Sequence, residues 1–126
     1  MAMLLEMRNI SKSFPGVKAL NGFSIDLKAG EVHALVGENG AGKSTLIKTL
    51  YGIHQPDGGQ IVIDGVPTKI NGPADALSKG IGVVFQELSV CPHLDIANNI
   101  FLGCIKNKHG VIDDRFAHEE AARLME

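Results

Sequence analysis

A glycine-rich loop in the first half of the chain has the residue types and spacing of a phosphate-binding site. It matches the pattern G-x-x-x-x-G-K-[ST] at every specified position, and its residues are Gly37, Glu38, Asn39, Gly40, Ala41, Gly42, Lys43, Ser44 and Thr45. The glycines let the backbone turn closely around an anion, so successive N–H groups can point at the α- and β-phosphates of a nucleoside triphosphate. Lys43 would place a positive charge near the β- and γ-phosphates, and the Ser44 hydroxyl can ligate Mg²⁺.

The segments on either side of this loop favour a strand, loop and helix arrangement. Residues 31–36 form a nearly continuous apolar run of strand length, as expected for a strand buried on both faces. After the loop, Leu46, Ile47 and Leu50 recur at helical spacing, and Gly52 stands where a helix would end. The N-terminus of that helix would add a partial positive charge to the anion site. A glycine-rich turn without a ligand is therefore disfavoured.

The pattern of the other elements predicts an α/β domain with an antiparallel subdomain. Residues 3–9 and 23–28 alternate apolar and polar side chains on either side of a break at Pro15-Gly16, which predicts two half-buried strands before the loop. Two such strands indicate an antiparallel part attached to a parallel core. The further elements expected are a short strand at 60–65, a helix at 73–80 and a short buried strand at 81–85.

The last third of the sequence has clear helix signals. Asp95 is expected to cap a short helix, and residues 106–110 are expected to form a polar loop. Asp113 or Asp114 would cap a last helix, whose apolar stripe consists of Ala117, Ala121, Leu124 and Met125. Because this stripe still continues at Glu126, we expect a truncated domain.

Four positions outside the loop are candidates for chemistry. Phe14, expected on a turn, is either a core-capping apolar residue or a stacking surface for a nucleotide base. Gln86 follows residues 81–85 and would face the same sheet edge as the phosphate loop, where an amide can help hold a metal or orient water. Asp57 and Asp64 are interpreted as turn residues rather than as an acid–base pair.

Composition and charge exclude several classes of protein. The 126 residues are 44% hydrophobic with a formal net charge of -2, which allows one domain with a sizeable core and does not favour nucleic-acid binding. No apolar run approaches the roughly 20 residues of a membrane span, and residues 1–6 lack signal-peptide features, so any membrane role is expected through a partner. Cys91 and Cys104 lack metal-ligand spacing and are expected to pack as reduced thiols.

Several landmarks occur together in the order found in one protein family. They are Phe14, the loop at 37–45, Pro56-Asp57-Gly58-Gly59 with Asp64-Gly65, and Val84-Phe85-Gln86-Glu87. On these residues the chain resembles the N-terminal part of an ATP-binding cassette (ABC) ATPase subunit, over essentially all 126 residues. The sequence of residues 36–46, 82–88 and 99–103 is similar to that of the first cassette of bacterial monosaccharide importers of the ribose, galactose or xylose type.

The resemblance implies a role for each landmark residue. Phe14 would stack on adenine, Lys43 and the loop amides would grip the phosphates, and Thr45 would touch the α-phosphate. Ser44 would ligate Mg²⁺, and Gln86 would be the Q-loop glutamine that contacts Mg²⁺ or the attacking water. The cofactors implied are therefore ATP and Mg²⁺.

The resemblance also implies an assembly at a membrane. In the family, two cassettes sandwich two ATP molecules, and their closure and opening drive alternating access in the membrane partner. The partners implied for the parent protein are transmembrane permease subunits, a periplasmic sugar-binding protein and a second cassette. The implied location is cytoplasmic, peripheral on the inner face of the cell membrane.

The sequence departs from the family pattern after Gln86. Residues 1–126 contain no Leu-Ser-Gly-Gly-Gln-like signature, Walker B strand or switch histidine, and Leu88-Ser89-Val90 begins like the signature but lacks its glycines. Residues 1–126 are thus interpreted as the N-terminal portion of an ABC nucleotide-binding domain, which includes the phosphate loop and extends just past the Q-loop. Because the missing parts polarise water and complete the partner's site, we expect weak Mg-ATP binding with negligible turnover.

Two other classes share part of this evidence. A P-loop GTPase or a small-molecule kinase would share the loop, but in Asn107-Lys108-His109-Gly110 the last residue replaces the acid that guanine recognition needs. Residues 57–60 likewise do not match D-x-x-G. A non-catalytic assembly is the other alternative, because a bare sheet edge and an apolar face invite pairing between chains.

Overall fold

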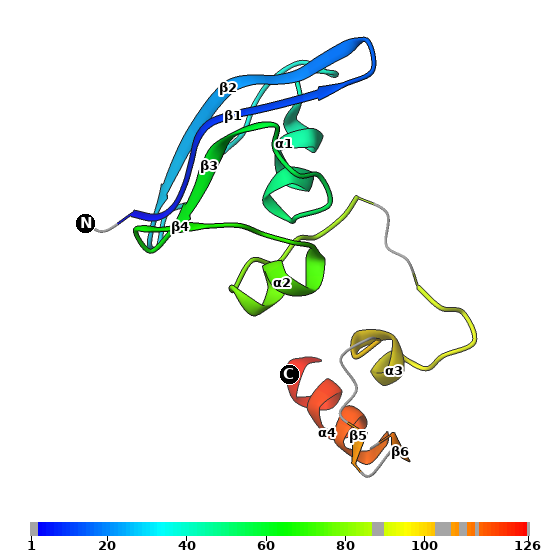
Figure 1. Ribbon diagram of the computed structural model, residues 1–126. Helices are drawn as coiled ribbons and strands as arrows, with labels where there is room; N and C mark the ends of the chain where they lie inside the picture. Colours follow the sequence, from blue (N-terminus) through cyan, green and yellow to red (C-terminus); the bar gives the residue numbers. More distant parts are fainter. Residues whose placement is uncertain (1–2, 87–89, 103–106, 109–110, 113, 126) are drawn as a thin grey trace. The chain divides into compact units, whose positions relative to one another are not determined.

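The computed structural model contains two compact units, Met1–Val84 and Phe85–Glu126 (Figure 1). The residues described are 3–86, 90–102, 107–108, 111–112 and 114–125. Among these residues, no helix is long and apolar enough to cross a membrane.

The first unit contains a four-stranded antiparallel sheet. Its strands are β1 (Met3–Phe14), β2 (Val17–Lys28), β3 (Gly58–Ile63) and β4 (Val66–Thr68), in the order β2-β1-β3-β4. The β1–β2 hairpin turns at Pro15-Gly16, with Phe14 paired to Val17. This sheet confirms the predicted antiparallel subdomain, and both of its first strands run longer than the alternating pattern indicated.

A bulge divides β1 into two halves. The β1–β3 register shifts between Arg8 and Ser11, where Asn9 has a φ of 52°. Gly59 lies opposite with a φ of 89°, and a Cβ there would come within 2.5 Å of the carbonyl oxygens of Arg8 and Asn9. Only glycine fits this close approach without a shift of the backbone. The last described β1–β3 pair is Ser11 with Gly58, so the end of β1 that carries Phe14 extends past β3.

Two helices pack on the sheet and close the core of the first unit. They are α1 (Lys43–Leu50) and α2 (Pro73–Ser78), which lie along one side of the strands (Figure 1). The buried core joins strand and helix residues: Leu5, Met7, Ile10, Leu20, Leu46, Ile61, Ile70 and Ala76. The proline start and glycine stop predicted for α2 are confirmed, with Pro73 in its first turn and Gly80 just beyond its end.

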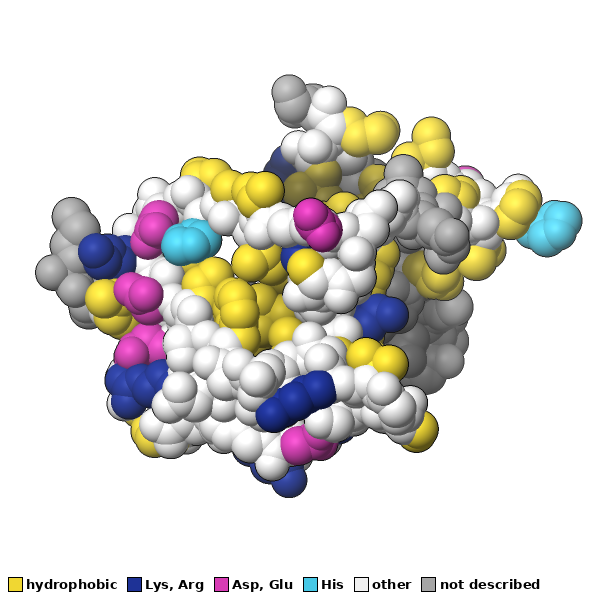
Figure 2. Space-filling view, turned by 90° about the horizontal axis from the view of Figure 1, so that it is seen from above, with side chains coloured by type: hydrophobic (Ala, Val, Ile, Leu, Met, Phe, Trp, Pro, Cys, Tyr) yellow, Lys and Arg dark blue, Asp and Glu magenta, His cyan; other side chains and the backbone are white. Residues whose placement is uncertain are grey.

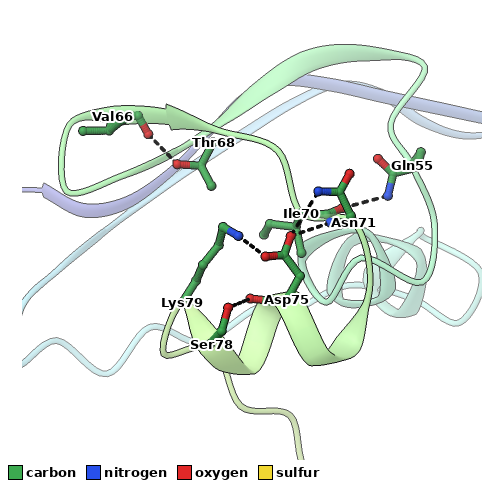
Figure 3. Close-up of polar contacts among 8 residues, drawn as sticks. All are labelled: Gln55, Val66, Thr68, Ile70, Asn71, Asp75, Ser78 and Lys79. Atoms are coloured by element: carbon green, nitrogen blue, oxygen red, sulfur yellow. Dashed lines mark hydrogen bonds and ion pairs between the residues drawn. The ribbon is translucent and has the colours of Figure 1, made fainter.

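A polar network fixes the start of α2 (Figure 3). The Asp75 carboxylate accepts hydrogen bonds from the Asn71 N–H at 2.8 Å and from the Lys79 ammonium. These donors, the Lys79 ammonium foremost, hold the pKa of Asp75 below its ordinary value of 3.8. Gln55 Nε2 donates to the Ile70 carbonyl at 2.7 Å, which ties the chain leaving α1 to the chain entering α2.

Two predicted strands are not strands in this structure. Residues 31–36 and 81–85 have no regular secondary structure, and Val32, Val36 and Val84 are 99%, 89% and 91% exposed. A strand buried on both faces needs hydrogen-bonded neighbours, and no described strand pairs with either segment. The space-filling view also shows hydrophobic side chains within a hollow of the surface (Figure 2).

The second unit is built on α3 (Ile96–Ile100) and α4 (Asp114–Met125). Their contact buries Ala97, Ala117 and Ala121, with Phe101 packed against them. Asp95 caps α3 as predicted, because its Oδ1 accepts the Asn98 N–H at 2.8 Å. For α4, the structure places the first helical residue at Asp114.

One loop prediction in this unit is corrected. Residues 106–110 were expected to form a polar loop, but Asn107–Lys108 form β5, which pairs with β6 (Val111–Ile112) in a short antiparallel ladder. Residues 106, 109 and 110 lie outside the described residues. The apolar residues Val111 and Ile112 form the second strand of this pair, which the polar composition of residues 106–110 did not indicate. The predicted cap Asp113 and the cysteine Cys104 lie outside the described residues.

Candidate functional site

The glycine-rich loop leads directly into α1, as the sequence predicts. Gly42 is the N-cap of α1 with a φ of 89°, and its carbonyl accepts the Leu46 N–H at 2.8 Å. Gly40 has a similar φ of 88°, and the Ala41 N–H donates to the Glu38 carbonyl at 3.1 Å. Both glycines adopt the left-handed conformation that other residues disfavour. The loop therefore curls over the N-terminus of α1, where the first N–H groups have no partner inside the helix.

Lys43 holds its charge within the curl of the loop. Its Nζ donates to the carbonyl of Gly37 at 2.5 Å and to that of Glu38 at 2.7 Å. Ser44 is exposed in the first turn of α1, and Thr45 beside it is half-buried. An ammonium, a helix N-terminus and an exposed hydroxyl form a donor set that fits a polyphosphate and its metal ion.

The loop is pressed against the β1–β2 hairpin. A Cβ on Gly42 would lie 2.4 Å from the Ala19 carbonyl oxygen and 3.1 Å from Leu20 Cδ2. The apolar cavity beside this contact has a volume of about 60 Å³, lined by residues that include Phe23 and Leu35. That volume is far below the several hundred Å³ of a small-molecule pocket, so a nucleotide would lie on the open side of the loop.

Phe14 ends β1, immediately before the turn rather than on it. Phe14 is 37% exposed, so it is not a buried core residue. The His54 ring meets it edge-on, with centroids 5.1 Å apart and planes at 74°. Lys12 Nζ lies over the Phe14 ring, 5.7 Å from the centroid. The ring therefore has a defined setting and an exposed surface.

Asp57 is a site neighbour that the sequence analysis treated only as a turn residue. Its Oδ1 accepts from Lys12 Nζ at 2.8 Å, and its Oδ2 accepts from the Ser13 N–H at 2.7 Å. The Lys12 ammonium, followed by the Ser13 N–H, holds the pKa of the Asp57 carboxyl below its ordinary value. The sequence around Asp57 does not indicate this contact, because its partner Lys12 lies more than forty positions earlier in the chain.

Gln86 lies in the other unit, so the structure does not place it relative to the phosphate loop. It is exposed, in a bend directly after residues 81–85. The residues that follow it, Glu87 to Ser89, lie outside the described part of the chain. The structure thus brings the loop and the Phe14 hairpin together, whereas the role of Gln86 stays a prediction.

Comparison with known proteins decides the family. The sequence model of the family described as "ABC transporter" matches residues 20–126. The chain belongs to this family. Its match begins within β2 and includes the whole phosphate loop and both units' helices, so the recognised resemblance and the cassette fold class are confirmed.

Curated relatives are sugar-import proteins by name. The chain is 54% identical to the ribose import ATP-binding protein RbsA 1 of Rubrobacter xylanophilus, over 98% of this chain and 24% of the relative. It is 50% identical to the arabinose import ATP-binding protein AraG of Vibrio parahaemolyticus, over 97% of this chain and 25% of the relative. The chain therefore spans about a quarter of the length of these relatives.

Solved ABC cassettes have the same fold. The chain is 26% identical to MJ1267, an ATP-binding cassette of an ABC transporter, with a TM-score of 0.79 over 99% of this chain and 53% of that one. A nucleotide-free ATP-binding cassette from an ABC transporter is 27% identical, with a TM-score of 0.71 over 98% of this chain and 53% of that one. The antiparallel sheet and helices described above are thus part of a P-loop cassette.

Proposed function

We propose that the chain binds Mg-ATP through residues 37–45. The observation that carries the proposal is the Lys43 ammonium, held inside a glycine loop at the N-terminus of α1. In the complex, the loop amides and Lys43 would bind the phosphates, Thr45 would contact the α-phosphate and Ser44 would ligate Mg²⁺. When bound, Mg²⁺ neutralises charge between the β- and γ-phosphates.

Phe14 and Gln86 complete the proposed site. Phe14 would stack on adenine, which is supported by its exposure and by the contact of its hairpin with the loop at Gly42. Gln86 would contact Mg²⁺ or the attacking water through its amide. The described residues contain no cluster of three or more His, Cys, Asp or Glu that could hold a metal. The proposed Mg²⁺ ligands are Ser44, Gln86 and the phosphates.

We further propose that residues 1–126 form the N-terminal portion of a nucleotide-binding domain in a protein that powers sugar import. The names of the ribose and arabinose import relatives support this assignment. The whole protein would then work with permease subunits, a periplasmic sugar-binding protein and a second cassette, on the cytoplasmic face of the membrane. For the 126-residue chain itself we propose weak Mg-ATP binding without turnover, since its sequence includes no Walker B or signature motif.

The proposal is tested by calorimetric titration of the chain with Mg-ATP, comparing Lys43→Ala with Lys48→Ala. Lys48 is an exposed lysine in the last turn of the same helix, so it controls for loss of one positive charge. Loss of the charge-assisted bonds of Lys43 should weaken binding about tenfold to a hundredfold, while Lys48→Ala binds as the wild type does. Equal affinity in all three proteins, or family-like phosphate release by the wild-type chain, contradicts the proposal.

A further inference from the structure

The turn between α1 and β3 forms several hydrogen bonds with the end of β1. The Asp57 carboxylate accepts from Lys12 Nζ and from the Ser13 N–H, and the Asp57 N–H donates to the Ser11 carbonyl at 2.8 Å. The side chain of Lys12 is only 17% exposed, so its ammonium is held in a defined place. One residue of the turn therefore contacts three successive residues of the strand.

We propose that Asp57 is a positioning residue for the base-stacking ring of Phe14. This inference rests on the proposed function, because it takes Phe14 to be the residue that meets the nucleotide base. Asp57 would act through Lys12 and the backbone at Ser13, to which its carboxylate is hydrogen-bonded. Its action would be to fix the ring before the nucleotide arrives.

The end of β1 needs such support because it extends past β3. Beyond Ser11, β1 still pairs with β2, through Ser13 with Lys18 and Phe14 with Val17. No described strand pairs with its other edge there. The Asp57 carboxylate accepts the Ser13 N–H and so takes the place of a strand neighbour. Without the carboxylate, the Ser13 N–H loses this hydrogen bond and Lys12 loses its partner.

The same turn also restrains the Phe14 side chain. Asp57 fixes Lys12, whose ammonium lies 5.7 Å from the ring centroid, a distance at which a cation is attracted to an aromatic face. His54, earlier in the turn, packs edge-on against the ring, and its N–H donates to the Lys48 carbonyl at the end of α1. The ring is thus restrained by a segment anchored to the helix whose other end begins at the phosphate loop. A ring fixed in advance loses less freedom when a base stacks on it.

The experiment compares Mg-ATP with Mg-tripolyphosphate, which carries the phosphates but no base. The variants are Phe14→Ala, Asp57→Ala, Asp57→Asn and the double variant, measured on the 126-residue chain. Asp64→Asn is the matched control, because Asp64 is an exposed turn residue at the opposite end of β3 and its φ of 49° suits asparagine. Tyr51 fluorescence during urea unfolding checks that each variant is folded.

Phe14→Ala and Asp57→Ala should each weaken Mg-ATP binding by about threefold to tenfold, as expected for loss of one aromatic contact. Tripolyphosphate binding should stay within about twofold, and Asp57→Ala should add nothing further to Phe14→Ala. Asp57→Asn keeps an oxygen for Ser13 but loses the charge that holds Lys12, so its affinity should lie between wild type and Asp57→Ala. Asp64→Asn should bind both ligands as the wild type does.

The outcomes separate this inference from the proposed function. If Phe14→Ala weakens ATP binding and Asp57→Ala does not, the positioning role of Asp57 is wrong while the proposed site stands. If Asp57→Ala weakens both ligands equally, or unfolds the chain while Asp57→Asn behaves as wild type, Asp57 supports the fold alone and the inference is overturned. If Phe14→Ala leaves ATP binding unchanged, the proposed base site and the inference fail together.

Discussion

The contact between the phosphate loop and the hairpin makes Gly42 the most informative position to change. In Gly42→Ala the new Cβ would lie 2.4 Å from the Ala19 carbonyl oxygen, at a φ of 89°. Gly40→Ala is a natural control, because Gly40 has a φ of 88° and nothing within 4 Å of the added Cβ. The two variants share the backbone strain and differ in the clash.

The expected loss of stability follows from the backbone strain and from the clash. The left-handed conformation costs an L-residue about 1–2 kcal/mol, which is the whole expected effect of Gly40→Ala. In Gly42→Ala the Ala19 backbone or the loop must also move, and overpacking of this kind costs about 1–3 kcal/mol more. Gly42→Ala should therefore lower the free energy of unfolding of the first unit by about 2–5 kcal/mol.

Urea unfolding followed by tyrosine fluorescence measures this difference directly. The chain has one tyrosine and no tryptophan, so the signal comes from Tyr51, which packs against the core of the first unit. The second unit contains no tyrosine or tryptophan, so it does not contribute to this signal. Equal destabilisation by the two substitutions would refute the contact between loop and hairpin.

Three further predictions concern the core, a carboxyl group and the second unit. Met7 is 1% exposed, so Met7→Ala should lower the free energy of unfolding by about 2–5 kcal/mol in a urea titration. Leu4 is 46% exposed, so Leu4→Ala should change this free energy little. Similar losses in the two variants would contradict the prediction. The pKa of Asp75 is lowered in the folded chain, so its contribution to the stability of the fold is present above the ordinary value of 3.8 and is lost as the pH falls through the lowered pKa. A pH titration followed by NMR of the carboxyl carbon should therefore give a midpoint below 3.8. A midpoint at or above 3.8 would refute the contact with Lys79. Asn99→Ala removes the acceptor of the Cys91 N–H, so hydrogen exchange at that amide should become faster. The exchange rates of the amides in α1 should not change. An unchanged exchange rate at Cys91 would contradict the hydrogen bond.

The sequence predicted well those features that depend on local chemistry. The phosphate loop, the start of α1 and the Asp95 cap each follow from a residue whose preference is set by its own backbone. The alternating strands β1 and β2 were found because one face of each packs on the core and the other is wet. Their antiparallel pairing then required only a short turn.

Features that depend on distant partners could not be predicted. Residues 31–36 and 81–85 read as buried strands, yet apolar composition alone does not supply the neighbouring strands that hydrogen-bond such segments. Asp57 looks like any turn aspartate until the bulged end of β1 is brought beside it. Asn99 was read only as part of a family-like stretch, although its side chain bonds Cys91, Leu94 and Asp95 and ties that loop to α3.

The central claim is that residues 37–45 bind the phosphates of Mg-ATP, and an amide NMR titration of the 126-residue chain tests it most directly. The account predicts saturable shifts that are largest at the N–H groups of Gly40, Gly42, Lys43 and Ser44, with weaker shifts at the Phe14 hairpin. The hairpin shifts should be absent with Mg-tripolyphosphate, which has no base. Saturable shifts confined to other parts of the chain, or no saturable shift at the loop, would contradict the account.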